Sequence, residues 1–196
     1  AHDAAGNNSG FSNTVNVTTL SNTVTYCASK GNNSSYEWID LVKLNNMNNP
    51  SGNDGGYKDN TNISANLPYG SNTIQISAGF SGSSYREYWR IWVDFNQNGT
   101  FDSNELVVSG SSSSSATLSA TFNVPTSALT GATRMRVSMK YNASQSPCET
   151  FSYGEVEDYT VIISNSFNQG ITGGTDFNST ATVSYTHLRA HETSLH

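Results

Sequence analysis

The run from Asp94 to Glu105 has the residue types and the spacing of a calcium-binding loop. It matches the pattern D-x-[DN]-x-[DN]-G-x5-E at every specified position. Gly99 supplies the sharp turn that such loops need. The predicted ligands are Asp94, Asn96, Asn98, Thr100 (through its carbonyl), Asp102 and Glu105. Because calcium takes about six to eight oxygen ligands, the run predicts a Ca²⁺ site.

A simpler interpretation of the same run is a polar turn between two strands, since Asp, Asn and Gly are common turn formers. Asp102 and Glu105, at the offsets of a calcium loop, favour the metal site. Only three of the predicted ligands carry a negative charge, namely Asp94, Asp102 and Glu105. The dissociation constant is therefore expected at the weak, extracellular end of the range, about 10⁻⁴–10⁻³ M, where the ion stabilises the fold.

The residues on either side of the loop predict strands rather than the helices of a helix–loop–helix site. Tyr85, Trp89, Ile91, Val93 and Phe95 fall on one side of a two-residue period. A second apolar run follows the loop at 106–108. The opposite face of the first strand carries Tyr88 and Trp92, which are candidate ligand contacts. Their alternative role is packing in the core or at its rim, which is the commoner one for aromatic residues.

Further strands are expected along the chain, separated by turn signals. The clearest is 134–141, where Met135, Val137 and Met139 alternate with polar residues. The others are 23–27, 36–44 (where a short helix is the alternative), 73–77, 118–124 and 154–163. The predicted fold class is all-β, an antiparallel β-sandwich of about eight strands.

The composition divides the chain into three parts. Residues 1–22 read as a linker or the end of a preceding domain, and 23–164 as the sandwich. Residues 165–196 read as a linker followed by a non-native disordered tail, which holds three of the four histidines. The first residues suggest a fragment of a longer protein.

Charge and cysteine content indicate an exported protein. Charged residues make up 12% of the chain, the formal net charge is -6, and no Lys/Arg-rich run occurs, which argues against nucleic acid as a partner. No apolar stretch reaches the ~18 residues of a membrane helix. Cys27 and Cys148 are expected to form one disulfide in a secreted setting, whereas two free thiols would be expected in the cytosol.

The segment Gly154–Tyr159 reads GEVEDY, and several other segments accompany it. They are 26–29, 36–39, 51–52, 56–59, 79–81, 92–99, 129–131 and 134–136. With these motifs the chain resembles the GEVED domain of exported bacterial proteins, which is often found beside secreted peptidases. The resemblance covers about 25–164 and implies a β-sandwich accessory domain with no established catalytic centre. Where family members carry Asp-x-Asp in the loop, this chain has Asn96 and Asn98.

The acids of the GEVEDY segment allow three roles: ligands of an ion, a surface for a basic partner, or ion pairs within the fold. The strand 134–141 offers Arg134 and Arg136 as cross-strand partners. The third role is favoured, with Glu157 or Asp158 paired to one of these arginines.

Catalysis is not expected, because the region 23–164 contains no histidine that could serve as a base. The predicted function is that of a calcium-stabilised accessory module of a secreted or cell-surface bacterial protein. It is expected to act as a monomeric unit of a larger chain, binding an extracellular polysaccharide or a protein surface. The alternatives are a targeting or folding segment of a secreted peptidase, or a structural spacer.

Overall fold

The computed structural model describes residues 24–165. This part of the chain contains ten β-strands and one short 3-10 turn, joined by loops. The strands are β1 (Lys30–Asn33), β2 (Glu37–Leu44), β3 (Met47–Asn49), β4 (Tyr57–Pro68), β5 (Gly70–Phe80), β6 (Glu87–Val93), β7 (Leu106–Ser112), β8 (Leu118–Val124), β9 (Gly131–Tyr141) and β10 (Thr150–Ser164). The turn η1 (Ser103–Glu105) precedes β7. The predicted linkers and tail lie outside the described residues.

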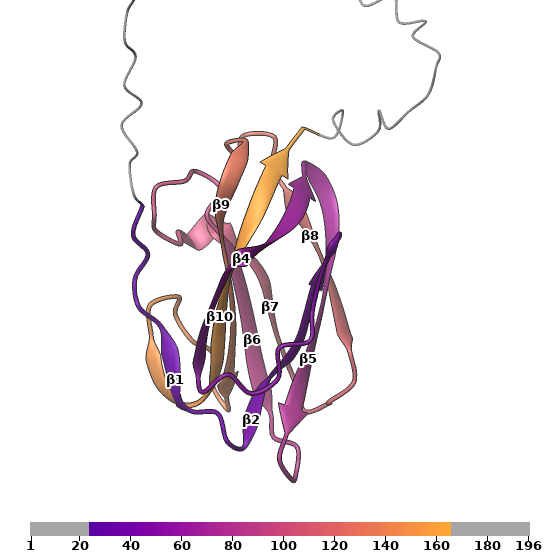
Figure 1. Ribbon diagram of the computed structural model, residues 1–196, viewed down its shortest axis with the longest axis vertical. Helices are drawn as coiled ribbons and strands as arrows, with labels where there is room; N and C mark the ends of the chain where they lie inside the picture. Colours follow the sequence, from indigo (N-terminus) through magenta and orange to yellow (C-terminus); the bar gives the residue numbers. More distant parts are fainter. Residues whose placement is uncertain (1–23, 166–196) are drawn as a thin grey trace, which may run out of the picture.

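The strands form two sheets that stack face to face (Figure 1). The first has six strands in the order β1-β10-β9-β6-β7, with β4 also paired to β10, and the second has four in the order β3-β2-β5-β8. The predicted all-β sandwich is therefore confirmed. Within residues 24–165 no helix is long and apolar enough to cross a membrane.

The prediction of a purely antiparallel arrangement is wrong in one respect. Both β1 and β4 pair with β10 in parallel, β1 at residues 150–153 and β4 at residues 156–164. This is possible because β10 is 15 residues long, so one of its edges can accept two shorter strands in succession. The structure accordingly has more strands than the predicted eight.

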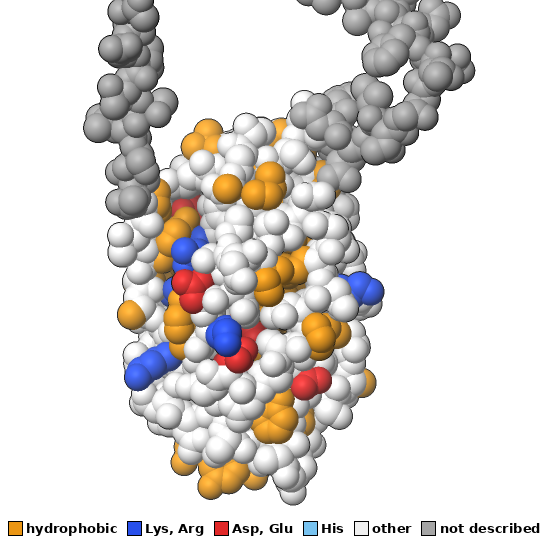
Figure 2. Space-filling view, viewed as in Figure 1, with side chains coloured by type: hydrophobic (Ala, Val, Ile, Leu, Met, Phe, Trp, Pro, Cys, Tyr) orange, Lys and Arg blue, Asp and Glu red, His pale blue; other side chains and the backbone are white. Residues whose placement is uncertain are grey.

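The core lies between the two sheets. It is built from the residues of each strand that point inward, roughly every second one. Ile39, Val42 and Leu44 of β2 face Ile91 and other apolar side chains of the opposite sheet, and all are fully buried. Most of the surface in Figure 2 is uncharged, as the low content of charged residues leads one to expect.

The outer face of β9 is not solvent-exposed as its amphipathic pattern predicts. Arg136 and Ser138 are both buried, because residues 24–29 and the loop before β10 cover this face of the sheet. Arg136 donates from Nη1 to the carbonyl oxygens of Cys27 (2.9 Å) and Pro147 (2.7 Å), one from each covering segment.

Candidate functional site

The predicted calcium loop begins at Asp94, directly after β6, and ends at β7. Asp94 is fully buried, and its carboxylate accepts hydrogen bonds from the loop's own backbone. Oδ1 accepts from the N–H of Asn98 (3.2 Å), and Oδ2 accepts from the N–H of Gly99 (2.9 Å) and the hydroxyl of Tyr26 (2.7 Å). Gly99 has φ +85°, a left-handed conformation that favours glycine. The Asp94 carboxylate therefore holds the backbone of the loop in its turned conformation.

Four further predicted ligands converge at the exposed mouth of the loop. The Nδ2 groups of Asn96 and Asn98 each donate to Oδ2 of Asp102 over 3.1 Å. Oδ1 of Asn98 accepts from the hydroxyl of Thr100 (2.6 Å). The side-chain oxygens of this group are the hard ligands that calcium prefers.

Glu105 faces the interior of the loop instead of its mouth. Its Oε1 accepts from the N–H groups of Phe95 (2.8 Å) and Asn96 (3.2 Å), and its Oε2 accepts from the N–H of Asp102 (2.9 Å). Burial raises the pKa of Glu105, and these backbone hydrogen bonds oppose that shift. Both oxygens therefore hold the loop's backbone.

The loop consequently fits a calcium ion in part. Asn96, Asn98, Asp102 and the Thr100 carbonyl could hold an ion at the mouth, with Asp94 behind them, whereas Glu105 could reach it only by releasing backbone N–H groups. Among residues 24–165 no three His, Cys, Asp or Glu side chains are grouped so that they could hold a metal. Calcium binding stays a prediction.

Asp158, on β10, joins both arginines of the neighbouring strand β9. Arg136 donates from Nε to Oδ1 and from Nη2 to Oδ2, each over 2.7 Å, and Arg134 donates from Nη1 to Oδ2 (3.0 Å). Asp158 and Arg136 are both buried and lie opposite each other in the strand register. The hydroxyl of Tyr57 also donates to Oδ2 (3.2 Å). The ion pair therefore forms through Asp158.

Glu157, the other acid considered for that ion pair, does not take part in it. Successive strand residues point to opposite faces, so Glu157 lies on the far side of β10 from Asp158. There it accepts a hydrogen bond from the hydroxyl of Tyr159 (2.6 Å), and burial raises its pKa to about 7.

Glu155, the first acid of the segment, binds backbone N–H groups on the other side of the sandwich. Its carboxylate accepts from Ile39 (2.9 Å), Asp54 (2.7 Å) and Gly56 (3.2 Å). Glu155 therefore links β10 to β2 and to the loop before β4. Each GEVEDY acid thus has a separate bonding role within the fold.

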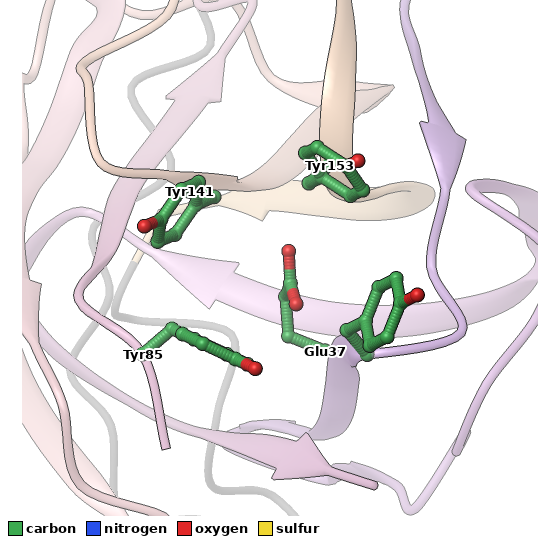
Figure 3. Close-up of a pocket in the computed structure, with 5 residues that line it drawn as sticks. Glu37, Tyr85, Tyr141 and Tyr153 are labelled. Atoms are coloured by element: carbon green, nitrogen blue, oxygen red, sulfur yellow. The ribbon is translucent and has the colours of Figure 1, made fainter. Parts of the chain in front are cut away.

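A group of residues that the sequence did not single out as a site surrounds a cavity of about 220 Å³ at one end of the sandwich (Figure 3). Its rim is made by four tyrosines, here called the tyrosine ring: Tyr36, Tyr85, Tyr141 and Tyr153. The carboxylate of Glu37 points into the space between them. A second buried acid, Glu87, lies near Glu37 in the opposite sheet.

A signal for these acids was present in the sequence. Glu87 occupies the same two-residue period as Trp89, Ile91 and Val93, so it continues the inward row of β6. An acid in an otherwise apolar row is unusual, because burying a carboxylate is costly.

Residues 88–162 match the GEVED domain family. The chain contains a GEVED domain. The match includes the calcium-loop run, the two arginines and the GEVEDY strand. No curated protein matches the sequence.

Several solved structures resemble the chain at low sequence identity. The CARDB domain of the PF1109 protein from Pyrococcus furiosus, in complex with di-metal ions, is 10% identical with a TM-score of 0.34, over 66% of this chain and 94% of its own. The catalytic domain of LPMO Lmo2467 from Listeria monocytogenes is 10% identical with a TM-score of 0.31, over 53% and 61%. A CBM33 from Bacillus amyloliquefaciens, in complex with Cu(I), is 15% identical with a TM-score of 0.29, over 57% and 58%.

The predicted disulfide joins the segment before β1 to the region that matches the GEVED family. Cys27 and Cys148 are bonded, with their Cα atoms 5.4 Å apart. The bond joins the two segments that cover Arg136. A disulfide is typical of an extracellular or otherwise oxidising location.

Trp92 and Tyr88, the predicted ligand contacts on β6, differ in their exposure to solvent. Trp92 is 2% exposed and packs beside Phe101, with ring centroids 6.4 Å apart, so it cannot be a surface contact for a ligand. Phe101 belongs to the loop 94–105, so this loop contributes to the burial of Trp92. Tyr88 is partly exposed and lies on the same outer face.

Proposed function

We propose that this GEVED domain is a non-catalytic accessory module that attaches a secreted or cell-surface bacterial protein to an extracellular polysaccharide or protein. The tyrosine ring carries the proposal. Of the seven exposed large hydrophobic residues in the described part of the chain, four belong to this ring. Exposed aromatic rings that gather in one place are typical of binding surfaces, because they stack on sugar rings and on polypeptide.

The position of the ring suits attachment. Its members come from the ends of strands at the lower end of the sandwich in Figure 1, whereas β10 leaves the described domain at the upper end. Hydrophobic side chains also gather at the lower end in Figure 2. A ligand at the ring would therefore be held away from the point where β10 continues into the rest of the chain.

Two further observations support a module without chemistry of its own. The described residues contain no histidine. The acids Asp94, Glu105, Glu155 and Asp158 are bound by backbone N–H groups, tyrosine hydroxyls or arginines. Calcium at the loop mouth would add stability without taking part in ligand binding.

Retention of the full chain on insoluble polysaccharides and on collagen tests the proposal. A Tyr141→Ser, Tyr153→Ser variant should lose retention, while Leu129→Ser, which removes an exposed hydrophobic side chain outside the ring, should keep it. Absence of retention on every matrix, together with calcium-dependent stability, would instead indicate a spacer or a folding segment of a secreted peptidase.

A further inference from the structure

The four residues of the tyrosine ring form a row of contacting side chains along the cavity. Ring centroids lie 6.0 Å apart for Tyr36 and Tyr153, 6.3 Å for Tyr153 and Tyr141, and 5.6 Å for Tyr141 and Tyr85. These residues are 36–49% exposed, so the row is open to solvent on one side. Aromatic faces arranged in this way attract a cation through their quadrupoles.

The floor of the cavity is an acid without a partner. Glu37 is only 2% exposed, yet it lines the cavity, so its carboxylate can be reached only from inside the ring (Figure 3). Among the described residues no hydrogen bond or ion pair satisfies this carboxylate, and burial alone raises its pKa.

Glu87 adds a second unsatisfied carboxylate. It is fully buried, and neither Oε atom has a hydrogen-bond partner within residues 24–165. Burial and the nearby charge of Glu37 raise its pKa to about 8. Glu87 lies behind the cavity and is not among the residues that line it, so Glu37 is the one acid of this pair that a group in the cavity can reach. Buried polar groups are nearly always hydrogen-bonded, so the Glu37 carboxylate is expected to take a donor from a group that enters the cavity.

No lysine or arginine lines the cavity. A neutral sugar could stack on the tyrosines, but it would leave the Glu37 carboxylate uncompensated. A cation with N–H donors satisfies the rings and this carboxylate together. A quaternary ammonium ion would offer no donors. The compact ammonium group of lysine, on its flexible four-carbon stem, suits a single carboxylate at the floor of a cavity better than the wider, planar guanidinium of arginine.

We infer that the cavity inside the tyrosine ring binds the primary ammonium group of a lysine side chain on a partner protein. The inference rests on the proposed function, since it names the ligand chemistry of the same surface. The ammonium group enters through the open side of the ring, its N–H groups donate toward Glu37, and the alkyl chain lies against the tyrosine rings.

Titration of the full chain with a short peptide, Gly-Lys-Gly with blocked ends, followed by NMR, tests this inference. Matched peptides carry Nε-acetyl-lysine, Nε-trimethyl-lysine or arginine in place of lysine. We expect the lysine peptide to bind and each of the others to bind about tenfold or more weakly, because charge or donors are lost or misplaced. Equal binding of the acetylated, trimethylated or arginine peptide would overturn the inference.

The variant Glu37→Gln keeps the shape of the side chain and should weaken lysine binding about tenfold or more. Asp40→Asn is the control, because it removes one negative charge from an exposed position of β2 outside the cavity. Thermal melts establish that the variants are folded. Binding that is unchanged in Glu37→Gln would overturn the inference.

The peptide titration and the retention experiment can fail independently of each other. If the chain is retained on polysaccharide but ignores the lysine peptide, the inference fails and the proposed function stands. If the lysine peptide binds but no matrix retains the chain, the inference stands and attachment to those matrices fails.

Discussion

Asp158 lies at the centre of a buried charge network in which removal of one member leaves another charge without its partner. It accepts from Arg136 over 2.7 Å, and both side chains are buried. Asp158→Ala should lower the free energy of unfolding by about 3–5 kcal/mol, because the Arg136 guanidinium then stays buried without a counter-charge. Urea unfolding measures this loss. The Arg136→Ala, Asp158→Ala double variant should be little worse than either single variant.

The control for this cycle is Lys58→Ala. Lys58 pairs with Asp54 but is half exposed, so its removal should change the free energy of unfolding by less than about 1 kcal/mol. Fully additive losses at Arg136 and Asp158 would contradict the coupling of the pair.

Glu87 gives the domain a pH-dependent stability. Its pKa is raised from the ordinary value of 4.5 to about 8, so its contribution to stability is fully present below pH 4.5. As the pH rises to about 8 the unfolded chain loses this proton and the folded chain retains it, so the free energy of unfolding falls. At about 1.4 kcal/mol for each pKa unit, the loss is at most a few kcal/mol.

Urea unfolding of the full chain at pH 5 and pH 8 measures this effect. Glu87→Gln should lose less stability between the two pH values than the unmodified chain. Glu157, whose pKa is raised to about 7, contributes a separate decrease that persists in the Glu87→Gln variant. An identical pH dependence in both chains would contradict a protonated Glu87.

At the scale of residues, the sequence could predict that an acid of β10 pairs with an arginine of β9, but not which acid does so. Arg136 and Asp158 lie on adjacent strands with opposite charges, which suffices to expect an ion pair. Glu157 and Asp158 are neighbouring acids, and the register of β10 against β9 decides which of them meets arginine, because it places Asp158 opposite Arg136 and Glu157 opposite Val137.

At the scale of elements, the loop 94–105 holds two carboxylates in different surroundings. Asp102 lies at the exposed mouth, while both oxygens of Glu105 bind backbone N–H groups. Calcium at about ten times its dissociation constant should stabilise the chain by roughly 1.4 kcal/mol. A melting curve with calcium against chelator should then show a difference of about 3–6 °C.

Two variants divide these roles. Asp102→Asn should abolish the calcium response and leave the melting temperature in chelator nearly unchanged. Glu105→Gln should destabilise the chain by about 1–3 kcal/mol with or without calcium, because its amide nitrogen cannot accept from the N–H of Asp102. If the melting temperature does not change with calcium, the loop is a polar turn and not a calcium site.

The strands that the sequence predicted are those with a clear two-residue period, such as β8 and β9. β4 could not be predicted in this way, because 57–68 is rich in Asn and polar residues and buries few apolar side chains. It forms because β10 offers a long free edge, a tertiary contact that has no local signal.

At the scale of the whole molecule, the Cys27–Cys148 disulfide joins segments that are 121 residues apart in the sequence. The bond fixes residues 24–29 over the outer face of β9, where Arg136 donates to both covering segments. In the chain-entropy model, closing a loop of this length stabilises the folded state by about 4–5 kcal/mol. Cys27→Ser, Cys148→Ser should therefore lower the free energy of unfolding by about this amount, measured by urea unfolding.

The same variant should also change the surface over β9. Without the bond, residues 24–29 are held mainly by hydrogen bonds such as those from Arg136 to Cys27 and from Tyr26 to Asp94, so they should open more often than the sandwich unfolds. Hydrogen exchange should become faster in 24–29 and in the calcium loop, where the hydroxyl of Tyr26 supports Asp94. Exchange in β2 and β5, which belong to the opposite sheet, serves as the control. Uniform acceleration across the domain would contradict a local role and indicate that the disulfide acts through the unfolded chain alone.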